Sequence, residues 1–421
     1  MQIYELFSFL HGKSYLCSYN QVPQKGLPMQ QTTNRNTIIG FDAKRIVRNG
    51  TGLGSYGRTL INSLADLAPD LQLRLYAPDR GRDDLRRQVF ERPNIHFFYP
   101  KGMHFRLQRD LWRTKGIVSQ LKSDGVAMYH GLSGELPVGL HRAGIPGLVT
   151  IHDLIFLRHP EFYHWLDVQI YRHKFYQTLR EASRIVAISE CTKRDIMYYG
   201  NFPEDHIDTI YQSCDTRFKT RMPGDQLAAT RQKYQLPARY LLSVGTIEER
   251  KNVLLAVKAL EALPTDLHLV LVGRRTKYAQ RVESYAQLHG LAKRLHFLHG
   301  VPNDDLFAIY QQAECFVYPS YYEGFGLPII EALQSGLPVV AATGSCLEEA
   351  GGPDCLYVAP NDVRGMAEAI IKSLNGADGR AERIAAGQHY VERFENSDTA
   401  TQMLKEYQLT LQEGSSFQNK G

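Results

Sequence analysis

Two glutamates that flank a glycine-rich stretch, Glu323 and Glu331, are the residues whose spacing most clearly suggests chemistry. The apolar run CFVYPS before them predicts a strand, and EGFGLP predicts a loop that opens a helix, with Pro328 suited to the first helical position. The free N–H groups at such a helix N-terminus, helped by the helix dipole, can hold a phosphate. These amides belong to Gly324, Phe325, Gly326 and Leu327.

The two carboxylates are expected to act on different parts of one ligand. Glu331 is predicted in the first turn of the helix, where it can accept hydrogen bonds from a ribose, and Glu323 precedes the loop, where it can accept them from sugar hydroxyls. A glutamate at a helix N-terminus can also serve only helix stability, by ~0.3–1 kcal/mol. The complete order of strand, Glu323, glycine loop, Leu-Pro and Glu331 favours a binding site over that role.

A second candidate element is SVGTIEERKN, in which a predicted strand ends at Gly245 and a helix follows from about Asn252. Arg250 and Lys251 lie near the start of that helix, where positive charge opposes the helix dipole. A neighbouring anion explains this placement, and a diphosphate is the natural one, with each charge-assisted bond contributing roughly 1.5–3 kcal/mol. The alternative is a solvated surface pair.

The first half of the chain carries two weaker signals. NGTGLGSYG, residues 49–57, predicts a flexible glycine loop at the mouth of a cleft, with Gly52 and Gly54 at its centre, although its spacing departs from the dinucleotide fingerprint. His152 and Asp153 come where the predicted strand GLVTI gives way to a loop. A histidine is often structural, but a His-Asp pair at the end of a parallel strand favours a role in a site.

Short apolar strands alternate with helical stretches from Thr37 onward, and a second series begins at Tyr240. This alternation predicts parallel sheets covered on both faces, in the α/β class. We therefore expect two doubly wound, Rossmann-like domains that face each other across a cleft, with ligands at the carboxyl ends of the strands. The predicted segments are a flexible lead-in at 1–36, a first domain at 37–214, a second at 215–396, and a terminal amphipathic helix at 397–412 that packs back on the first domain.

Composition excludes several classes of protein. A length of 421 residues exceeds one ordinary core, and a net charge of +5 gives no argument for nucleic-acid binding. Six scattered cysteines without a Cys-x-x-Cys pair predict reduced, mostly buried thiols in a cytoplasmic protein, and no metal site. We expect neither a signal peptide nor a membrane-spanning helix, because the sequence has no basic n-region and no run of 18 apolar residues.

One region is locally basic. Residues 80–115 hold ten arginines and lysines against four acidic side chains. The region is either a solvated helix face or a patch that meets anionic lipid head groups or a phosphate-bearing acceptor. In the second case the protein would be peripheral on the inner membrane face.

The sequence resembles the retaining glycosyltransferases of family 4, which have the GT-B fold, from Ile38 to about Glu406. The specific segments, in order, are GTIEERKN, LVLVG, LHGVPNDDL, YPSYYEGFGLPIIEAL and SGLPVVAA, and they look most like bacterial mannosyl- or glucosyltransferases of surface-polysaccharide assembly. The resemblance implies a nucleotide-diphosphate sugar donor, GDP- or UDP-linked, and a glycan or lipid-linked acceptor.

The resemblance also implies roles for single residues. Glu323 would bind donor-sugar hydroxyls near the reacting carbon, and Glu331 would bind the ribose. Arg250, Lys251 and the amides of residues 324–327 would hold the diphosphate, next to Gly245. His152 would approach the sugar and the acceptor, Gly52 and Gly54 would lie in a loop over the donor phosphate, and VPNDDL would lie beside the base. Thr246 stands where several family members have an arginine. Arg250 and Lys251 are therefore expected to supply the positive charge near the diphosphate.

No Asp-x-Asp metal motif occurs, so a metal-independent enzyme without a cofactor is expected, in which positive side chains and helix dipoles replace a cation. Three other functions stay open at this point. They are a nucleotide-sugar epimerase or hydrolase of the same fold, a non-catalytic scaffold of a polysaccharide assembly complex, and a nicotinamide-dependent oxidoreductase. The last of these lacks the expected glycine spacing and acidic residue.

Overall fold

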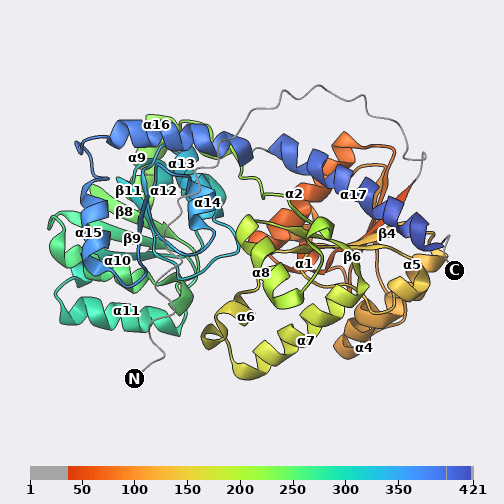
Figure 1. The fold of residues 1–421 in the computed structure, drawn as a ribbon. Helices are drawn as coiled ribbons and strands as arrows, with labels where there is room; N and C mark the ends of the chain where they lie inside the picture. Colours follow the sequence, from red (N-terminus) through yellow and green to blue (C-terminus); the bar gives the residue numbers. More distant parts are fainter. Residues whose placement is uncertain (1–36, 395, 419–421) are drawn as a thin grey trace, which may run out of the picture. The chain divides into compact units, whose positions relative to one another are not determined.

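Two separate sheets of parallel strands organise the chain in the computed structural model, which describes residues 37–394 and 396–418 (Figure 1). The first sheet has seven strands in the order β3-β2-β1-β4-β5-β6-β7. Its strands are β1 (Ile38–Asp42), β2 (Gln72–Tyr76), β3 (Ile95–Phe98), β4 (Met128–Gly131), β5 (Gly147–Ile151), β6 (Ala182–Ala187) and β7 (Ile207–Thr209). The predicted lead-in at 1–36 lies outside the described residues.

The second sheet has six strands in the order β10-β9-β8-β11-β12-β13. They are β8 (Arg239–Val244), β9 (Leu267–Val272), β10 (Leu295–Leu298), β11 (Cys315–Tyr318), β12 (Val339–Ala342) and β13 (Leu356–Val358). All of the strand pairs in both sheets are parallel. The predicted α/β architecture is confirmed.

Each sheet reverses its strand order once, between β1 and β4 in the first and between β8 and β11 in the second. The central strands are almost completely buried, as shown by Phe41, Val149, Leu242 and Phe316, because helices cover both faces. In such sheets the loops that leave the carboxyl ends of the strands on either side of the reversal diverge and leave room for a ligand. The loops after β8 and β11 are therefore the place to look for the site.

The helices alternate with the strands. Those that accompany the first sheet are α1 (Lys44–Arg48), α2 (Gly52–Leu67), α3 (Asp83–Arg86), α4 (Arg106–Leu111), α5 (Ile117–Ser123), α6 (Ile155–Arg158), α7 (Trp165–Glu181) and α8 (Glu190–Gly200). The later ones are α9 (Gly224–Tyr234), α10 (Val253–Ala259), α11 (Lys277–Leu288), α12 (Asn303–Gln311), α13 (Leu327–Gln334), α14 (Leu347–Gly351), α15 (Val363–Ile371), α16 (Arg380–Val391) and α17 (Asn396–Gln418).

The last helix, α17, returns to the first sheet and lies along α2 (Figure 1). Met403 and Tyr407 are buried in the core that also contains Phe41. The hydroxyl of Tyr407 lies 2.9 Å from Nδ1 of the buried His130. The chain thus crosses between the two sheets twice, and the domain boundaries at residues 214 and 396 stay predictions.

Helix α12 follows Pro302 at its capping position, and Asn303 is its first helical residue. Five cysteines, Cys191, Cys214, Cys315, Cys346 and Cys355, are buried free thiols. None of the helices in the described residues combines the length and the apolar character needed to cross a bilayer.

Candidate functional site

A buried cluster of opposite charges lies where the loops after β8 and β11 meet. Oε1 of Glu323 lies 2.6 Å from Nζ of Lys251, and Oε2 lies 2.8 Å from Nη1 of Arg250. Arg250 and Lys251 come from the 3-10 turn Glu249–Lys251 that follows β8, and Glu323 lies between β11 and α13. Because β8 and β11 are neighbours in the sheet, the fold joins residues that are far apart in the sequence.

The electrostatics of this cluster depend on mutual neutralisation. Burial by itself would raise the pKa of Glu323, but Lys251 and Arg250 outweigh it and hold the pKa at about 2. Burial lowers the pKa of Lys251, and Glu323 opposes that shift. Arg250 also pairs with Glu248 at 2.8 Å. Two carboxylates therefore saturate the two cations, so an anionic ligand must compete with protein carboxylates for them.

Two further groups hold Lys251 in place. The Nζ atom of Lys251 donates a hydrogen bond of 2.5 Å to the hydroxyl of Tyr318, the last residue of β11. Gly245, at the end of β8, lies beside the lysine stem, since a Cβ built on it would be 3.5 Å from Cε of Lys251. The structure therefore brings together Gly245, Arg250, Lys251 and Glu323, which the sequence analysis had assigned to one donor site. Donor binding by these residues stays a prediction.

The glycine loop after Glu323 contacts the end of the first sheet. A Cβ on Gly324 would lie 2.0 Å from the carbonyl oxygen of His152, so only glycine permits this approach. The hydroxyl of Ser189 donates a hydrogen bond of 2.7 Å to the carbonyl oxygen of Gly324. Phe325 is buried and stacks on Tyr211 with ring centroids 5.5 Å apart. The loop and His152 thus lie next to each other.

The imidazole of His152 is fully engaged. Nε2 lies 2.9 Å from the carbonyl oxygen of Leu132, and Nδ1 lies 2.8 Å from Nε2 of Gln212. A carbonyl requires a donor, so Nε2 carries the proton and Nδ1 accepts from the Gln212 amide. Burial lowers the pKa of His152 to about 4 and keeps the ring neutral. A role of His152 in proton transfer would require one of these bonds to break.

The glycines of the first half do not lie in a loop, and that prediction is wrong. Helix α2 begins at Gly52, so Gly52 and Gly54 form its first turn. Asn49 and Thr51 make this possible, because Oδ1 of Asn49 accepts a hydrogen bond of 2.7 Å from the amide of Thr51. A Cβ on Gly54 would lie 1.8 Å from the carbonyl oxygen of Asn49, whereas one on Gly52 would meet nothing within 4 Å. The glycines therefore build a helix N-terminus rather than a flexible loop.

Glu331 lies one turn later than predicted. The first helical residue of α13 is Leu327, Pro328 is the second, and no acidic residue is in the first turn. The hydroxyl of Tyr310 donates a hydrogen bond of 2.8 Å to Oε2 of Glu331. Burial raises the pKa of Glu331 to about 7, although the Tyr310 bond opposes the shift.

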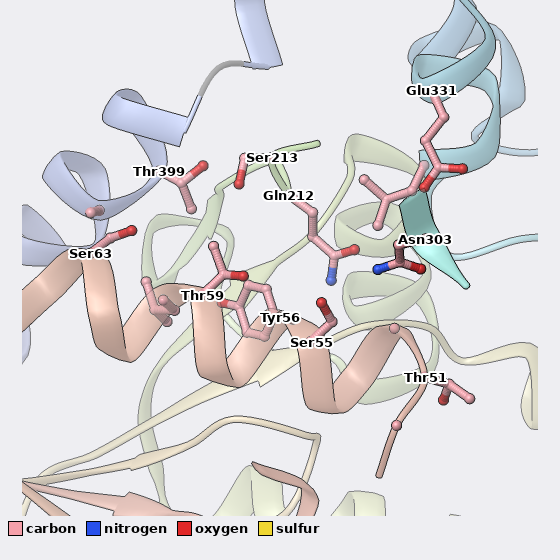
Figure 2. A pocket seen from close by; sticks show the side chains of 15 residues that line it. Thr51, Ser55, Tyr56, Thr59, Ser63, Gln212, Ser213, Asn303, Glu331 and Thr399 are labelled. Carbon is pink, nitrogen blue, oxygen red and sulfur yellow. The ribbon is translucent and has the colours of Figure 1, made fainter. Parts of the chain in front are cut away.

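Glu331 borders a pocket of about 260 Å³ that also receives the N-terminus of α2 (Figure 2). In Figure 2, Glu331 and Asn303 lie opposite Ser55, Tyr56 and Thr59 of α2, with Gln212 between them. The lining residues are Gly50, Thr51, Gly52, Ser55, Tyr56, Thr59, Leu60, Ser63, Gln212, Ser213, Asn303, Leu327, Glu331, Thr399 and Ala400. Most of the side chains that line the pocket carry hydroxyl or amide groups, which suit a polar ligand.

The predicted residues thus fall into three neighbouring groups. Gly52, Leu327 and Glu331 line the pocket, the residues around Glu323 form the ion-paired cluster, and Gly324 contacts His152. Gly54, Phe325 and Gly326 are not among the residues that line the pocket. Sequence reasoning missed Tyr310 and Gln212. The only signal for Gln212 in the sequence is its position shortly after the strand β7, because site residues often follow strand ends.

Comparison with known proteins gives the class. Residues 50–218 match the family described as Glycosyltransferase Family 4, and residues 228–390 match Glycosyl transferases group 1. The fold is that of the GT-B glycosyltransferases. The crystal structure of Anabaena Alr3699/HepE in complex with UDP and glucose superposes with a TM-score of 0.68, at 17% identity over 89% of this chain and 100% of that one.

The relatives narrow the class to a family. O-antigen chain mannosyltransferase B of Escherichia coli is 32% identical over 85% of this chain and 96% of its own length. The serotype-specific mannosyltransferase WbdA of Escherichia coli is 27% identical over 68% of this chain, which spans 36% of that protein. The chain belongs to the group 1, family 4 glycosyltransferases, and an O-antigen chain mannosyltransferase is among its relatives.

Proposed function

We propose that this glycosyltransferase moves a hexose, of the mannose or glucose type, from a GDP- or UDP-linked sugar to a hydroxyl of a glycan or lipid-linked acceptor, with retention of configuration. Mannose is favoured because the relatives are mannosyltransferases. The observation that carries the proposal is the buried cluster of Glu323 with Arg250 and Lys251. Such a cluster supplies two cations for a diphosphate and one carboxylate for sugar hydroxyls.

Donor binding would rearrange this cluster. The diphosphate would take the place of Glu323 on Arg250 and Lys251, in charge-assisted bonds of roughly 1.5–3 kcal/mol each. The carboxylate so released would accept hydrogen bonds from the hydroxyls of the sugar. The amides that open α13 would add donors to the phosphate, as helix N-termini do. In this exchange both cations keep an anionic partner, and the Glu323 carboxylate keeps hydrogen-bond donors.

The nucleoside part would occupy the pocket beside Glu331. Its carboxylate would bind the ribose hydroxyls, and Asn303 would lie towards the base. A HepE protein of the same fold was crystallised with UDP and glucose, which supports a nucleotide-sugar ligand here. The N-terminus of α2, with Gly52, would approach the phosphate from the other side of the pocket.

The proposed reaction proceeds on one face of the sugar. The bond from the anomeric carbon to the diphosphate oxygen breaks, the acceptor oxygen bonds to the same face, and its proton passes to the leaving diphosphate. Both ring nitrogens of His152 are engaged, so the ring does not suit the role of general base, and the proposal assigns that role to the leaving diphosphate. Positive side chains and helix dipoles would stabilise the leaving group without a metal ion.

The decisive experiment is a donor screen with the purified protein. GDP-mannose, UDP-glucose and related donors are incubated with and without mannose-terminated acceptors, and released nucleoside diphosphate is measured. Release that depends on the acceptor supports the proposal. Release without acceptor would favour an epimerase or hydrolase, and no release with any donor would favour a scaffold. An inverted linkage in the product, determined by NMR, would exclude the same-face mechanism.

A chelator tests the metal-free part of the proposal. Activity in excess EDTA should equal activity without it, because the diphosphate charge is met by Arg250 and Lys251. A steep loss that Mg²⁺ or Mn²⁺ restores would contradict this part. Binding of reduced nicotinamide nucleotides would favour the oxidoreductase, and we expect none.

We also propose a peripheral location on the cytoplasmic face of the inner membrane, through residues 80–115. Ion pairs within the protein neutralise much of this region, as in Arg82–Asp84, Arg86–Asp83, Arg92–Asp66, Arg106–Asp110, Arg109–Asp79 and Arg113–Asp42. Exposed apolar side chains give stronger support, because Phe105, Leu107 and Leu111 are exposed around α4. Exposed apolar side chains next to Lys101 and Lys115 suit an anionic lipid surface.

Sedimentation with vesicles tests this location. Wild-type protein should bind vesicles that contain phosphatidylglycerol and not pure phosphatidylcholine vesicles. The double change Leu107→Ser and Leu111→Ser should reduce binding at least tenfold, while Leu288→Ser, at an exposed leucine of α11, should not. Equal binding by both variants would exclude the α4 surface.

A further inference from the structure

A separate pocket of about 200 Å³ opens in the first half of the chain, beside His152 and Asp153. Its lining residues are Arg45, Leu53, Ser133, Gly134, Glu135, Ile151, His152, Asp153, Leu154, Phe156, Tyr163, Tyr171, Lys174 and Phe175. The donor proposal uses none of these except His152. One side of the pocket is aromatic, and the opposite side carries charged groups.

The aromatic wall consists of three rings that contact one another. Tyr171 is central, with ring centroids 5.7 Å from Phe156 and 6.3 Å from Tyr163. These residues come from α6, from the residue after the 3-10 turn Pro160–Phe162, and from α7. Tyr171 keeps 42% of its surface exposed, so part of an aromatic wall faces solvent without a partner. The rings meet edge to face, at interplanar angles of 64° and 87°, so they form an apolar corner in which the face of Tyr171 is open to a ligand.

The opposite side is polar and held in place. Glu135 accepts hydrogen bonds from Nη1 of Arg113 at 2.6 Å and from Nζ of Lys174 at 3.0 Å. Oδ1 of Asp153 accepts a bond of 3.2 Å from the amide of Ile155. Lys174 is therefore neutralised by Glu135, and Arg45 forms no ion pair among the described residues. The pocket is lined by two basic side chains, Arg45 and Lys174, and two acidic ones, Glu135 and Asp153, so it has no excess of positive charge that would select a phosphate.

The pocket adjoins the reacting centre. A Cβ on Gly324 would lie 3.0 Å from Cβ of Asp153, so Asp153 lies against the loop that carries Glu323. The volume is below the ~300–1,000 Å³ of pockets that enclose drug-sized ligands. It suits one sugar ring rather than a nucleotide. A pyranose ring has an apolar C–H face for the aromatic wall and hydroxyls for carboxylates.

We propose that this pocket binds an uncharged hexose residue of the acceptor glycan, with its C–H face on Tyr171, its edge against Tyr163 and its hydroxyls on Asp153 and Glu135. This inference rests on the proposed function and names the acceptor class for it. The ring is held beside the loop of Glu323, where the donor sugar would be. Tyr171 and Tyr163 are thus acceptor-positioning residues, and a phosphorylated sugar is a poorer ligand than a neutral one.

Kinetics with a mannose disaccharide as acceptor test the proposal. Tyr171→Ala should raise the KM for the acceptor at least tenfold and leave the KM for the donor unchanged, because the donor lies elsewhere. Tyr171→Phe should stay close to wild type, since the ring face is retained. Tyr198→Ala is the matched control: it removes a tyrosine that is 75% exposed on α8 and does not line this pocket. An unchanged acceptor KM in Tyr171→Ala and in Tyr163→Ala would overturn the proposal.

Titration of the disaccharide without donor separates the two proposals. Wild-type protein should bind it and Tyr171→Ala should bind at least tenfold more weakly, whether or not transfer is observed. Disaccharide binding that Tyr171→Ala weakens, in a protein that transfers no sugar, would support the pocket and refute the proposed function. Transfer with equal binding by both proteins would do the reverse. Tighter binding of mannose 6-phosphate than of methyl mannoside would contradict the neutral-sugar assignment.

Discussion

The hydroxyl of Tyr310 on α12 donates a hydrogen bond of 2.8 Å to Oε2 of Glu331 on α13. This bond aims a half-buried carboxylate at the pocket of Figure 2 instead of at solvent. Burial nevertheless dominates, and the pKa of Glu331 is raised to about 7. The carboxylate is therefore close to half protonated near neutral pH in the absence of a ligand.

The raised pKa predicts a pH-dependent stability. The folded protein keeps a proton on Glu331 that the unfolded chain, with an ordinary pKa of 4.5, releases between pH 4.5 and about 7. The contribution of this group to stability is thus largest below pH 4.5 and falls as the pH rises to 7. Relative to Glu331→Gln, the Tm of wild type should decrease across this window. A Tm difference that is constant from pH 4.5 to 8 would contradict the shift.

Removing Glu323 should affect turnover more than donor affinity. Glu323→Gln should lower kcat by ~10²–10³, the size seen when one preorganised polar group is removed from a reaction centre. It also leaves Lys251 without a carboxylate and Arg250 with Glu248 alone, so stability should decrease. The double variant Glu323→Gln with Lys251→Met should recover part of the lost Tm without recovering activity. Normal kcat in Glu323→Gln would falsify the role of this residue.

Removing Glu331 should act on the donor step instead. Glu331→Ala is expected to raise the KM for the donor with a smaller change in kcat, because a ribose contact is made equally in the ground and transition states. Tyr310→Phe removes the bond that orients the carboxylate and should give a milder form of the same change. Steady-state kinetics at saturating acceptor provide the measurement. An effect confined to kcat would place Glu331 at the reacting carbon.

Gly54 and Gly52 form a matched pair for the start of α2. Gly54→Ala places a Cβ 1.8 Å from the carbonyl oxygen of Asn49, so the first turn must shift and both Tm and donor affinity should fall. Gly52→Ala meets nothing within 4 Å and should leave the Tm unchanged. If the donor phosphate approaches this turn, Gly52→Ala should still weaken donor binding. Unaltered donor affinity in Gly52→Ala would mean that the phosphate lies elsewhere.

Arg184 and Glu406 anchor α17 to the first sheet. Nε of Arg184 donates to Oε2 of Glu406 at 2.9 Å, and only 7% and 4% of their side chains are exposed. Arg184→Met removes the ion pair of the buried Glu406 carboxylate and should cost about 3–5 kcal/mol. The exposed pair Arg364–Glu368, at 88% and 53% exposure, is the control, and Arg364→Met should leave the stability nearly unchanged because solvent screens the pair. Urea unfolding measures both. Equal, small effects would show that α17 is held by apolar packing alone.

Sequence alone was sufficient for the fold class and for the placement of Glu323 and the glycine loop between a strand and a helix. Apolar runs of strand length alternating with helical stretches are a local pattern, and burial of parallel strands on both faces produces it directly. The glycine loop before Pro328 is equally local, because a helix N-terminus is specified by its own residues. These features could be predicted because each depends on neighbours within a few positions.

Tertiary structure alone decided the partners of the charged groups. Glu323 meets Arg250 and Lys251 because β11 lies beside β8, and the basic region at 80–115 is largely neutralised by acids such as Asp42, Asp66 and Asp79 from other segments. The close approach of Gly324 to the carbonyl oxygen of His152 likewise joins segments that are far apart in the sequence. Hydrophobic periodicity records which face of an element is buried, but an ion pair or a close backbone contact depends on strand order. No local pattern in the chain contains that order.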